Sequence, residues 1–242
     1  MKVIICENYE EMSDKGAALI AAEVKQNPNA VLGLATGSSP IGMYSRLVDA
    51  YKKGELDFSS VKTYNLDEYL PIDPANKNSY CAFMHQHLWD KVNLKPENCH
   101  IPSGNIALED AEKQCAAYDD AIKAAGGIDL QLLGIGRNGH IGFNEPAESL
   151  SVGTHPVKLT ESTLAANGPL FDDPSEMPRH AVTMGMGSIF SAKKILIIAN
   201  GKAKHDAIKG LLNGGITTAL PASLLLLHPD VTLICDKEAY NG

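Results

Sequence analysis

The sequence has no long hydrophobic run and no cluster of basic residues. The longest apolar run near the C-terminus covers only Leu224 to Leu227, and the apolar N-terminal stretch turns polar at Glu7. A bilayer-spanning helix needs about 20 apolar residues, so no membrane anchor or signal-peptide core is expected. Twenty-one lysines and arginines stand against 29 aspartates and glutamates, a formal charge of −8. Nucleic acids and anionic membranes attract concentrated positive charge, so neither is an expected partner.

Cysteine is also scarce, and the sequence lacks the common motifs of covalent and metal catalysis. The five cysteines are scattered and show no CxxC or cysteine–histidine ligand spacing. Reduced thiols in a cytoplasmic protein account for them better than disulfides or a zinc site. There is no Gly-x-Ser-x-Gly elbow and no zinc-protease motif. These absences favour proton transfer on a bound anion over nucleophilic attack or metal-dependent hydrolysis.

Short apolar runs alternate with longer amphipathic stretches along the 242 residues. We expect strands near 2–5, 30–35, 61–66, 129–135, 194–199 and 231–235. Helices are expected near 9–26, 41–53, 78–91, 109–125, 202–212 and 222–228. This alternation predicts an α/β fold with an open, mostly parallel, Rossmann-like sheet and helices on both faces. No linker divides the chain, which predicts a single domain over 1–242.

The stretch 146–180 differs from the rest because it holds five prolines, two glycines and an acidic pair, Asp172-Asp173. This composition predicts a long irregular loop over a sheet edge, and such loops are often functional or mobile. We therefore regard 146–180 as a candidate lid.

Ligands of open parallel sheets bind outside the carboxyl ends of the strands, so the residues that follow each strand are the candidates. The strand near 30–35 is followed by Thr36-Gly37-Ser38-Ser39-Pro40. Pro40 suits the first position of a helix and Ser39 the N-cap before it. Hydroxyl groups, a glycine and a helix N-terminus make residues 36–39 a candidate phosphate cradle, although a well-capped helix without a ligand has the same pattern.

Two further strand ends carry titratable groups. Asp67 and Glu68 follow the strand near 61–66, and only one of two adjacent side chains can face the crevice. A carboxylate there is either a general base with a raised pKa or a solvated turn acid. Lys204 follows the strand near 194–199 and would meet a bound phosphate or lie in solvent.

The most informative run follows the strand near 129–135 and reads Gly134-Ile135-Gly136-Arg137-Asn138-Gly139-His140-Ile141-Gly142-Phe143-Asn144-Glu145-Pro146. Its Gly-x-Gly-x-x-Gly pattern is typical of a dinucleotide-binding site, but Gly142 and Pro146 would break the helix that such a site requires. The run instead predicts a glycine-rich turn that presents His140, Glu145 and Asn138. A histidine beside a carboxylate can pass a proton between two oxygens near neutral pH.

These segments together resemble the glucosamine-6-phosphate deaminase family. The resemblance rests on Leu34 to Pro40, Asn65-Leu66-Asp67-Glu68-Tyr69 and the run from Gly134 to Pro146, in matching order and spacing. It covers nearly the whole chain and extends through Pro221-Ala222-Ser223-Leu224 to His228-Pro229.

The resemblance implies that glucosamine 6-phosphate and water are converted to fructose 6-phosphate and ammonia, without a metal or organic cofactor. Asp67 would move the proton from C2 to C1, and His140, paired with Glu145, would shuttle a proton between O1 and O5 as the ring opens. Asn138 would complete the ring-opening relay. Thr36, Gly37, Ser38, Ser39 and Lys204 would hold the phosphate. The partner would thus be a small phosphosugar, and the protein a cytoplasmic monomer or homo-oligomer.

The sequence departs from the family pattern at two places in the site. Asn138 stands where many members have aspartate, and an amide cannot take a proton, so we expect it only to orient His140. The family's Ala-Asn-x-Arg-Phe run reads Ala166-Asn167-Gly168-Pro169-Leu170-Phe171 here, without the arginine that meets the phosphate. Arg179 or the N–H of Gly168 are candidates to replace it.

Some larger members of the family respond to an acetylated phosphosugar activator. The matching stretch from Ser151 to Lys158 has His155 and Val157 in place of a basic pair, so we expect little activation.

Two alternative functions stay open. A 6-phosphogluconolactonase has a similar fold and glycine–histidine turn but needs no base at Asp67, and the Asn144-Glu145-Pro146 run argues against it. A non-catalytic sugar-phosphate sensor would bind without turnover and normally carries a DNA-binding segment, for which we expect no room here.

Overall fold

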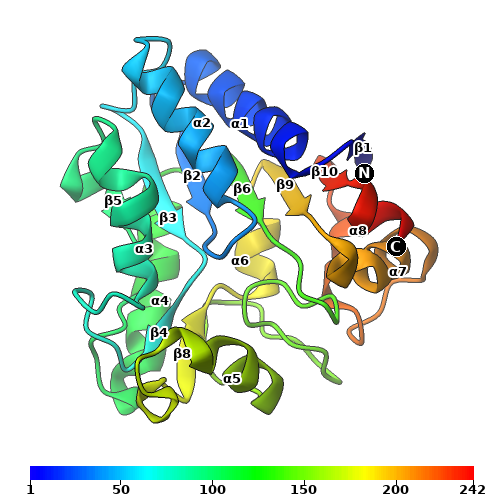
Figure 1. The fold of residues 1–242 in the computed structure, drawn as a ribbon. Coiled ribbons are helices and arrows are strands. Elements are labelled where there is room, and N and C mark those ends of the chain that lie inside the picture. Colours follow the sequence, from blue (N-terminus) through cyan, green and yellow to red (C-terminus); the bar gives the residue numbers. More distant parts are fainter.

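A seven-stranded parallel sheet runs through the computed structural model, which describes residues 1–242 (Figure 1). Its strand order is β1-β10-β9-β6-β2-β3-β5, and every neighbouring pair is parallel. The strands are β1 (Lys2–Cys6), β2 (Val31–Leu34), β3 (Lys62–Asn65), β5 (Cys99–His100), β6 (Leu130–Leu133), β9 (Lys194–Ala199) and β10 (Val231–Asp236). All predicted strands are present, and β5 is an additional one.

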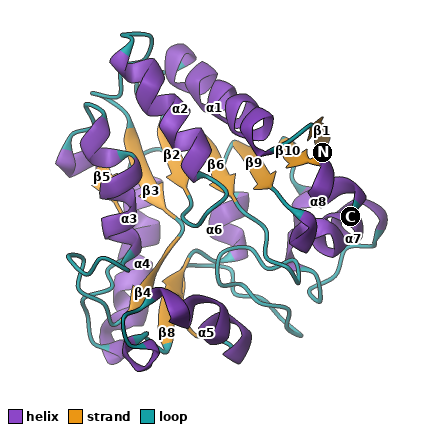
Figure 2. Ribbon diagram, in the orientation of Figure 1, coloured by secondary structure: helices purple, strands orange, loops and turns teal.

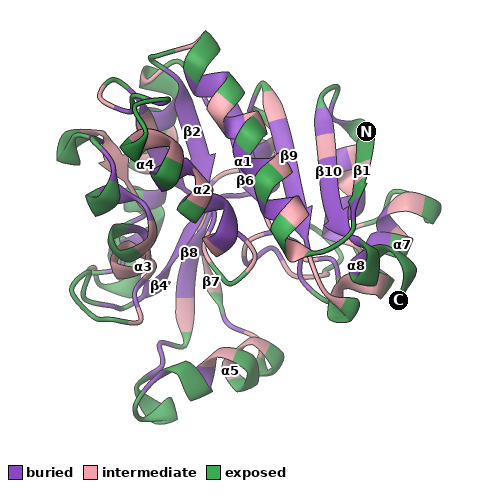
Figure 3. Cartoon of the chain, turned by 45° about the horizontal axis from the view of Figure 1, so that its top comes forward, coloured by how far each residue is buried: buried purple, intermediate pink, exposed green.

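Helices cover both faces of this sheet (Figure 2). On one face lie α1 (Tyr9–Gln26), α2 (Ile41–Lys52) and α3 (Tyr80–His87), and on the other α4 (Ala111–Ala124), α6 (Met186–Phe190), α7 (His205–Asn213) and α8 (Lys237–Asn241). A hydrophobic core lies on each face, and alternate residues of a strand contribute to the two. In β9, Leu196 and Ile198 pack on the first face, and Ile195 and Ile197 on the second. The five inner strands are accordingly buried along most of their length, whereas the edge strand β1 is mostly exposed (Figure 3). The predicted α/β fold is confirmed.

A second, antiparallel sheet extends from the first and was not predicted. It has the order β4-β8-β7, with β4 (Asp67–Leu70), β8 (His180–Thr183) and β7 (His155–Lys158). Only Leu66 separates β3 from β4: its N–H donates to Leu34 of β2, and its carbonyl accepts from Met184, just beyond β8. The chain therefore leaves one sheet and enters the other at Leu66, where the sequence predicted the end of a strand.

The expectation of an irregular loop over 146–180 is wrong in part, because this stretch contains β7, helix α5 (Glu161–Asn167) and the start of β8. Its prolines occupy positions that regular structure tolerates. Pro156 lies in β7, an edge strand of the small sheet, and Pro169 and Pro174 lie in the first turns of short 3₁₀ helices. Proline content was therefore a poor guide to structure here.

The remaining helical segments are 3₁₀ turns. The predicted helix near 222–228 is a 3₁₀ helix, Pro221–Leu227, and the other 3₁₀ segments are Trp89–Lys91, Pro96–Asn98, Leu108–Asp110, Gly168–Leu170, Pro174–Glu176 and Lys202–Lys204. None of the helices has the length and hydrophobicity that crossing a membrane would require.

Candidate active site

Polar segments from four strands of the large sheet meet at its carboxyl edge (Figure 1). The segment after β2 is joined to the turn after β9 by a hydrogen bond of 2.6 Å from Ser39 Oγ to Asn200 Oδ1. The residue in the N-cap position of α2 is Pro40, without a side-chain cap, so the expected N-cap role of Ser39 is wrong. The serine hydroxyl instead fixes the loop to its neighbour.

Residues 36–39, which we call the phosphate loop after their expected role, offer free hydrogen-bond donors. Their backbone N–H groups make no hydrogen bond within the protein. Gly37 has a φ of 100°, a left-handed conformation that favours glycine. Tyr9 holds the loop from behind, because its hydroxyl donates to the carbonyl of Ser38 and accepts from the N–H of Gly42. Unpaired N–H groups beside a helix N-terminus are suited to bind an anion.

Asp67 is a buried carboxyl with no hydrogen-bonding partner in the protein. It is the first residue of β4, opposite Thr183 of β8, and is 6% exposed. A Cβ atom placed on Gly142 would lie 3.4 Å from Asp67 Oδ2, so the carboxyl group faces the glycine-rich turn. Burial, and secondly the charge of Glu68, raise the pKa of Asp67 to about 8. The interpretation of Asp67 as a solvated turn acid is wrong, and its protonation equilibrium lies in the range useful for a general base.

The neighbouring Glu68 points elsewhere, as strand geometry requires. It is 1% exposed and accepts backbone N–H groups from Tyr69, Tyr80 and Cys81, the last two in the first turn of α3. Burial raises its pKa to about 7, although these three hydrogen bonds lower it. Glu68 therefore attaches β4 to α3 and takes no place in the crevice.

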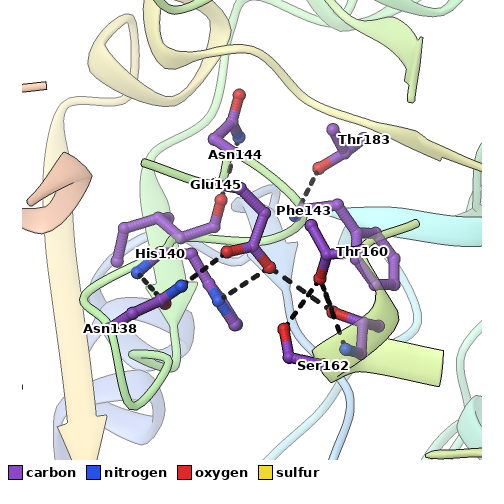
Figure 4. Close-up of polar contacts among 10 residues, drawn as sticks. Asn138, His140, Phe143, Asn144, Glu145, Thr160, Ser162 and Thr183 are labelled. Atoms are coloured by element: carbon purple, nitrogen blue, oxygen red, sulfur yellow. Dashed lines mark hydrogen bonds and ion pairs between the residues drawn. The ribbon is translucent and has the colours of Figure 1, made fainter. Parts of the chain in front are cut away.

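Asn138, His140 and Glu145 form one connected group (Figure 4). Nδ1 of His140 lies 3.1 Å from Oε1 of Glu145, and Nδ2 of Asn138 donates to Oε2 at 2.7 Å. Oδ1 of Asn138 accepts the backbone N–H of His140 at 3.2 Å. The amide thus contacts Glu145 and the backbone of His140, not the imidazole that we expected it to orient directly.

Burial raises the pKa of Glu145, but contacts with His140 and Asn138 outweigh burial and leave it below the ordinary value. An ionised carboxylate is therefore held against the imidazole and would stabilise its cationic form.

The glycines of the 134–146 run shape this turn. The N–H of Gly136 donates to the carbonyl of His140, and a Cβ atom on Gly136 would lie 2.3 Å from His140 Nε2. The imidazole therefore packs directly on the backbone of Gly136. The pattern that resembles a dinucleotide fingerprint opens no helix here and serves to seat His140.

Three residues that support the site were not singled out from the sequence. Asn144 donates to the carbonyls of Ile141 and Met184, and Thr183 Oγ1 accepts the N–H of Phe143, which fixes the turn to β8. Thr163 of α5 donates to Glu145 Oε1 at 3.4 Å. Asn144 lay within the quoted run, whereas the two threonines carry no local signal, because only the unpredicted small sheet and α5 bring them here.

Lys204 lies at the start of α7, half-buried and without an ion-pair partner. Burial, and secondly the charge of Arg137, lower its pKa. The chain has no cluster of three histidine, cysteine, aspartate or glutamate side chains that could hold a metal ion. The site thus offers a partner-free carboxyl, an imidazole–carboxylate pair, a loop with free N–H groups and an unpaired lysine, which together suit proton transfers on a small anion.

Comparisons with known proteins agree with this chemistry. The family model of glucosamine-6-phosphate isomerases/6-phosphogluconolactonases matches residues 7–234. A glucosamine-6-phosphate deaminase of Thermoanaerobacter pseudethanolicus is 55% identical over 99% of this chain and 94% of its own length. That of Halothermothrix orenii is 52% identical over 99% and 98%.

Among solved structures, a monomeric glucosamine-6-phosphate deaminase superposes with a TM-score of 0.95 at 44% identity, covering 99% of this chain and 98% of its own. A 6-phosphogluconolactonase from Trypanosoma cruzi, at a TM-score of 0.79 and 21% identity over 98% and 95%, shares the fold. From the family match and these identities, the chain belongs to the glucosamine-6-phosphate isomerase/6-phosphogluconolactonase family.

Proposed function

We propose that this protein is a glucosamine-6-phosphate deaminase, which converts glucosamine 6-phosphate and water to fructose 6-phosphate and ammonia in the breakdown of amino sugars. The observation that carries the proposal is the pairing of two proton-transfer groups at one sheet edge. Asp67 is buried without a partner beside Gly142, and His140 with Glu145 lies in the same turn. The reaction needs two such groups, because C2 becomes acidic only after the ring has opened to a free aldehyde.

Ring opening is the task of the His140 group. The imidazole accepts the proton of the O1 hydroxyl and returns it to O5, and Glu145, 3.1 Å away, stabilises the imidazolium between the two transfers. Asn138 keeps Glu145 in place but exchanges no proton.

Isomerisation is the task of Asp67. Its pKa of about 8 would leave much of the free enzyme protonated at neutral pH. The ammonium group on C2 of the substrate is a cation next to the reacting carbon, so its arrival favours the carboxylate. Asp67 then removes the C2 proton and delivers it to C1, and water replaces the amine to give the ketose and ammonia.

The phosphate is held by the phosphate loop and Lys204. Four free N–H groups of Thr36, Gly37, Ser38 and Ser39, the hydroxyls of Thr36 and Ser38, and one ammonium are available there. This interaction supplies binding energy remote from the reacting carbons, which orients C1 and C2 between the two proton-transfer groups.

Segment 146–180 is a lid in this proposal, within a single domain over 1–242. Its helix α5 contacts the site through Thr163 and Glu145, and Asn167 donates to the hydroxyl of Tyr69. These few contacts join the lid to the site, and the lid would cover a bound sugar. We further propose a cytoplasmic protein that acts as a monomer or homo-oligomer.

The test is to incubate the protein with glucosamine 6-phosphate and measure ammonia and fructose 6-phosphate. A lactonase would instead hydrolyse 6-phosphogluconolactone and release no ammonia, and a sensor would bind the phosphosugar without turnover. Either outcome would overturn the proposal.

The role of Asp67 has its own test. Asp67→Asn should abolish exchange of the C2 hydrogen with solvent deuterium while the phosphosugar still binds. Asp49→Asn, on α2 and outside the site, is the control that should keep wild-type exchange. Exchange at the wild-type rate in Asp67→Asn would remove Asp67 from this role.

A further inference from the structure

Two cations lie without anionic partners at the carboxyl edge of the large sheet. Arg137 is exposed and Lys204 is half-buried, and neither side chain takes part in an ion pair. By contrast, Arg46 binds the carboxylates of Glu10 and Asp14. Most cations of this chain form no ion pair, but these two lie at the ends of neighbouring strands of the sheet.

The geometry brings the two cations together. Arg137 is the second residue of the tight turn closed by the hydrogen bond from Gly139 N to Gly136 O, directly after β6. Lys204 follows β9, which pairs with β6 in the sheet. Burial lowers the pKa of Lys204, and the positive charge of Arg137 lowers it further. An anion between the two would offset this repulsion.

The phosphate loop is fixed to the segment that carries one of these cations. Ser39 is hydrogen-bonded to Asn200, four residues before Lys204, so the loop with its free N–H groups is fixed to the turn that leads to the lysine. Two cations and a set of unpaired N–H donors thus converge from the ends of β2, β6 and β9.

The segment in which the family resemblance implies an arginine offers no cation here. Residues 166–171 contain no basic side chain, and Asp172 and Asp173 follow them. Arg179 precedes β8 and lies four residues from Thr183, the β8 residue opposite Asp67, a distance of about 13 Å along an extended strand. The N–H of Gly168 already donates to the carbonyl of Leu164 at the end of α5. The two replacements considered from the sequence are therefore poorly placed.

We infer that Arg137 is a phosphate-binding residue of this enzyme, acting together with Lys204 and the phosphate loop in place of the arginine missing from 166–171. The inference rests on the proposed function for the identity of the phosphosugar, but not for the binding of phosphate by these groups. A guanidinium can donate two parallel hydrogen bonds to phosphate oxygens, which the ammonium of Lys204 cannot do.

The first test measures binding without turnover. Inorganic phosphate should raise the Tm of the wild-type protein, and the rise should be smaller in Arg137→Gln and unchanged in the control Arg179→Gln. Equal rises in wild type and Arg137→Gln, or an equal loss in Arg179→Gln, would overturn the inference. This readout stands even if the protein does not turn over glucosamine 6-phosphate, so failure of the proposed function is distinguishable.

The second test is kinetic. Arg137→Gln should raise KM for glucosamine 6-phosphate about tenfold or more, as expected for loss of a charge-assisted hydrogen bond, with kcat within about twofold. Arg137→Lys should recover part of the loss, and activity on unphosphorylated glucosamine should not change. A fall in kcat at unchanged KM would show that Arg137 supports the turn that holds His140 and does not bind phosphate.

Discussion

Asp67 and Glu68 are adjacent carboxyl groups whose different surroundings give them different roles. Asp67 lacks any hydrogen-bonding partner and faces Gly142, whereas Glu68 accepts three backbone N–H groups. The sequence alone identified the pair and the fact that only one of them could face the crevice. It could not show that both are buried, because burial comes from the small antiparallel sheet and α3, which local patterns do not reveal.

The charge of Glu68 should influence the pH dependence of the reaction. Its negative charge is the second cause of the raised pKa of Asp67. In Glu68→Gln, the pKa of Asp67 in the free enzyme should fall, so the acid limb of the kcat/KM profile should move to lower pH. In this variant an NH2 group would replace the carboxylate oxygen that accepts the N–H of Cys81. The loss of that hydrogen bond should cost about 1–3 kcal/mol of stability.

The measurement is kcat/KM between pH 5 and pH 9 for both proteins, with thermal unfolding as a check that the variant is folded. An acid limb that stays at the wild-type pH would exclude this electrostatic role of Glu68.

Glu145 should act through His140 and not through substrate binding. Glu145→Gln removes the charge that stabilises the imidazolium and should lower kcat about 10²-fold or more, with little change in KM. Thr163→Val is the matched control, because it removes the long 3.4 Å contact to the same carboxylate but leaves its charge. Turnover of Glu145→Gln close to wild type would contradict the ring-opening assignment.

At the scale of the element, the turns at the strand ends could be located from the sequence, but the contacts within and around them could not. The large sheet and its helices follow from alternating apolar runs, and the polar segments after β2, β3, β6 and β9 were found as site segments. By contrast, β4 and β7 were missed, because their residues include buried acids and an edge proline that normally indicate turns. The four residues of β8 were missed because they directly follow the proline-rich stretch. The contacts of Thr163 and Thr183 depend on those missed elements.

The glycines of the 134–146 turn give a test at this scale. A Cβ atom on Gly136 would lie 2.3 Å from His140 Nε2, while one on Gly134 would meet no atom within 4 Å. Gly136→Ala should therefore displace the imidazole and lower kcat at least tenfold, and Gly134→Ala should keep activity near wild type. Steady-state kinetics of both variants, with circular dichroism to confirm folding, is the measurement. Equal kinetics in the two would show that Gly136 does not seat His140.

At the scale of the whole molecule, the sequence predicts little response to an activator. The stretch from Ser151 to Lys158, which lacks the basic pair of the family pattern, includes β7. Val157 of this strand packs against the cluster around Tyr69 and Phe143. N-acetylglucosamine 6-phosphate should therefore leave kcat and KM unchanged in steady-state assays. An activation of several-fold would contradict this expectation.

The buried acids also couple the stability of the whole fold to pH. The folded-state pKa values of Asp67 and Glu68, about 8 and about 7, lie above their ordinary values of 3.8 and 4.5. The folded protein therefore holds protons that the unfolded chain would release. This contribution to stability is complete below about pH 4 and is lost as pH rises to about 8. Other carboxylates with lowered pKa values, Glu145 among them, act in the opposite direction at acid pH.

Asp67→Asn should isolate this effect, because the amide carries no charge at any pH and keeps the shape of the side chain. Since wild type must bury a carboxylate without a hydrogen-bonding partner at alkaline pH, the variant should be more stable than wild type at pH 8.5 by about 1–3 kcal/mol. The two should converge only at about pH 3.5, where Asp67 is protonated in the unfolded chain as well as in the folded protein. Denaturant unfolding of both proteins at the two pH values measures the difference. A constant difference across pH would mean that the carboxylate is already solvated in the folded enzyme, and Asp67 would then lack the desolvation that raises its pKa into the range of a general base.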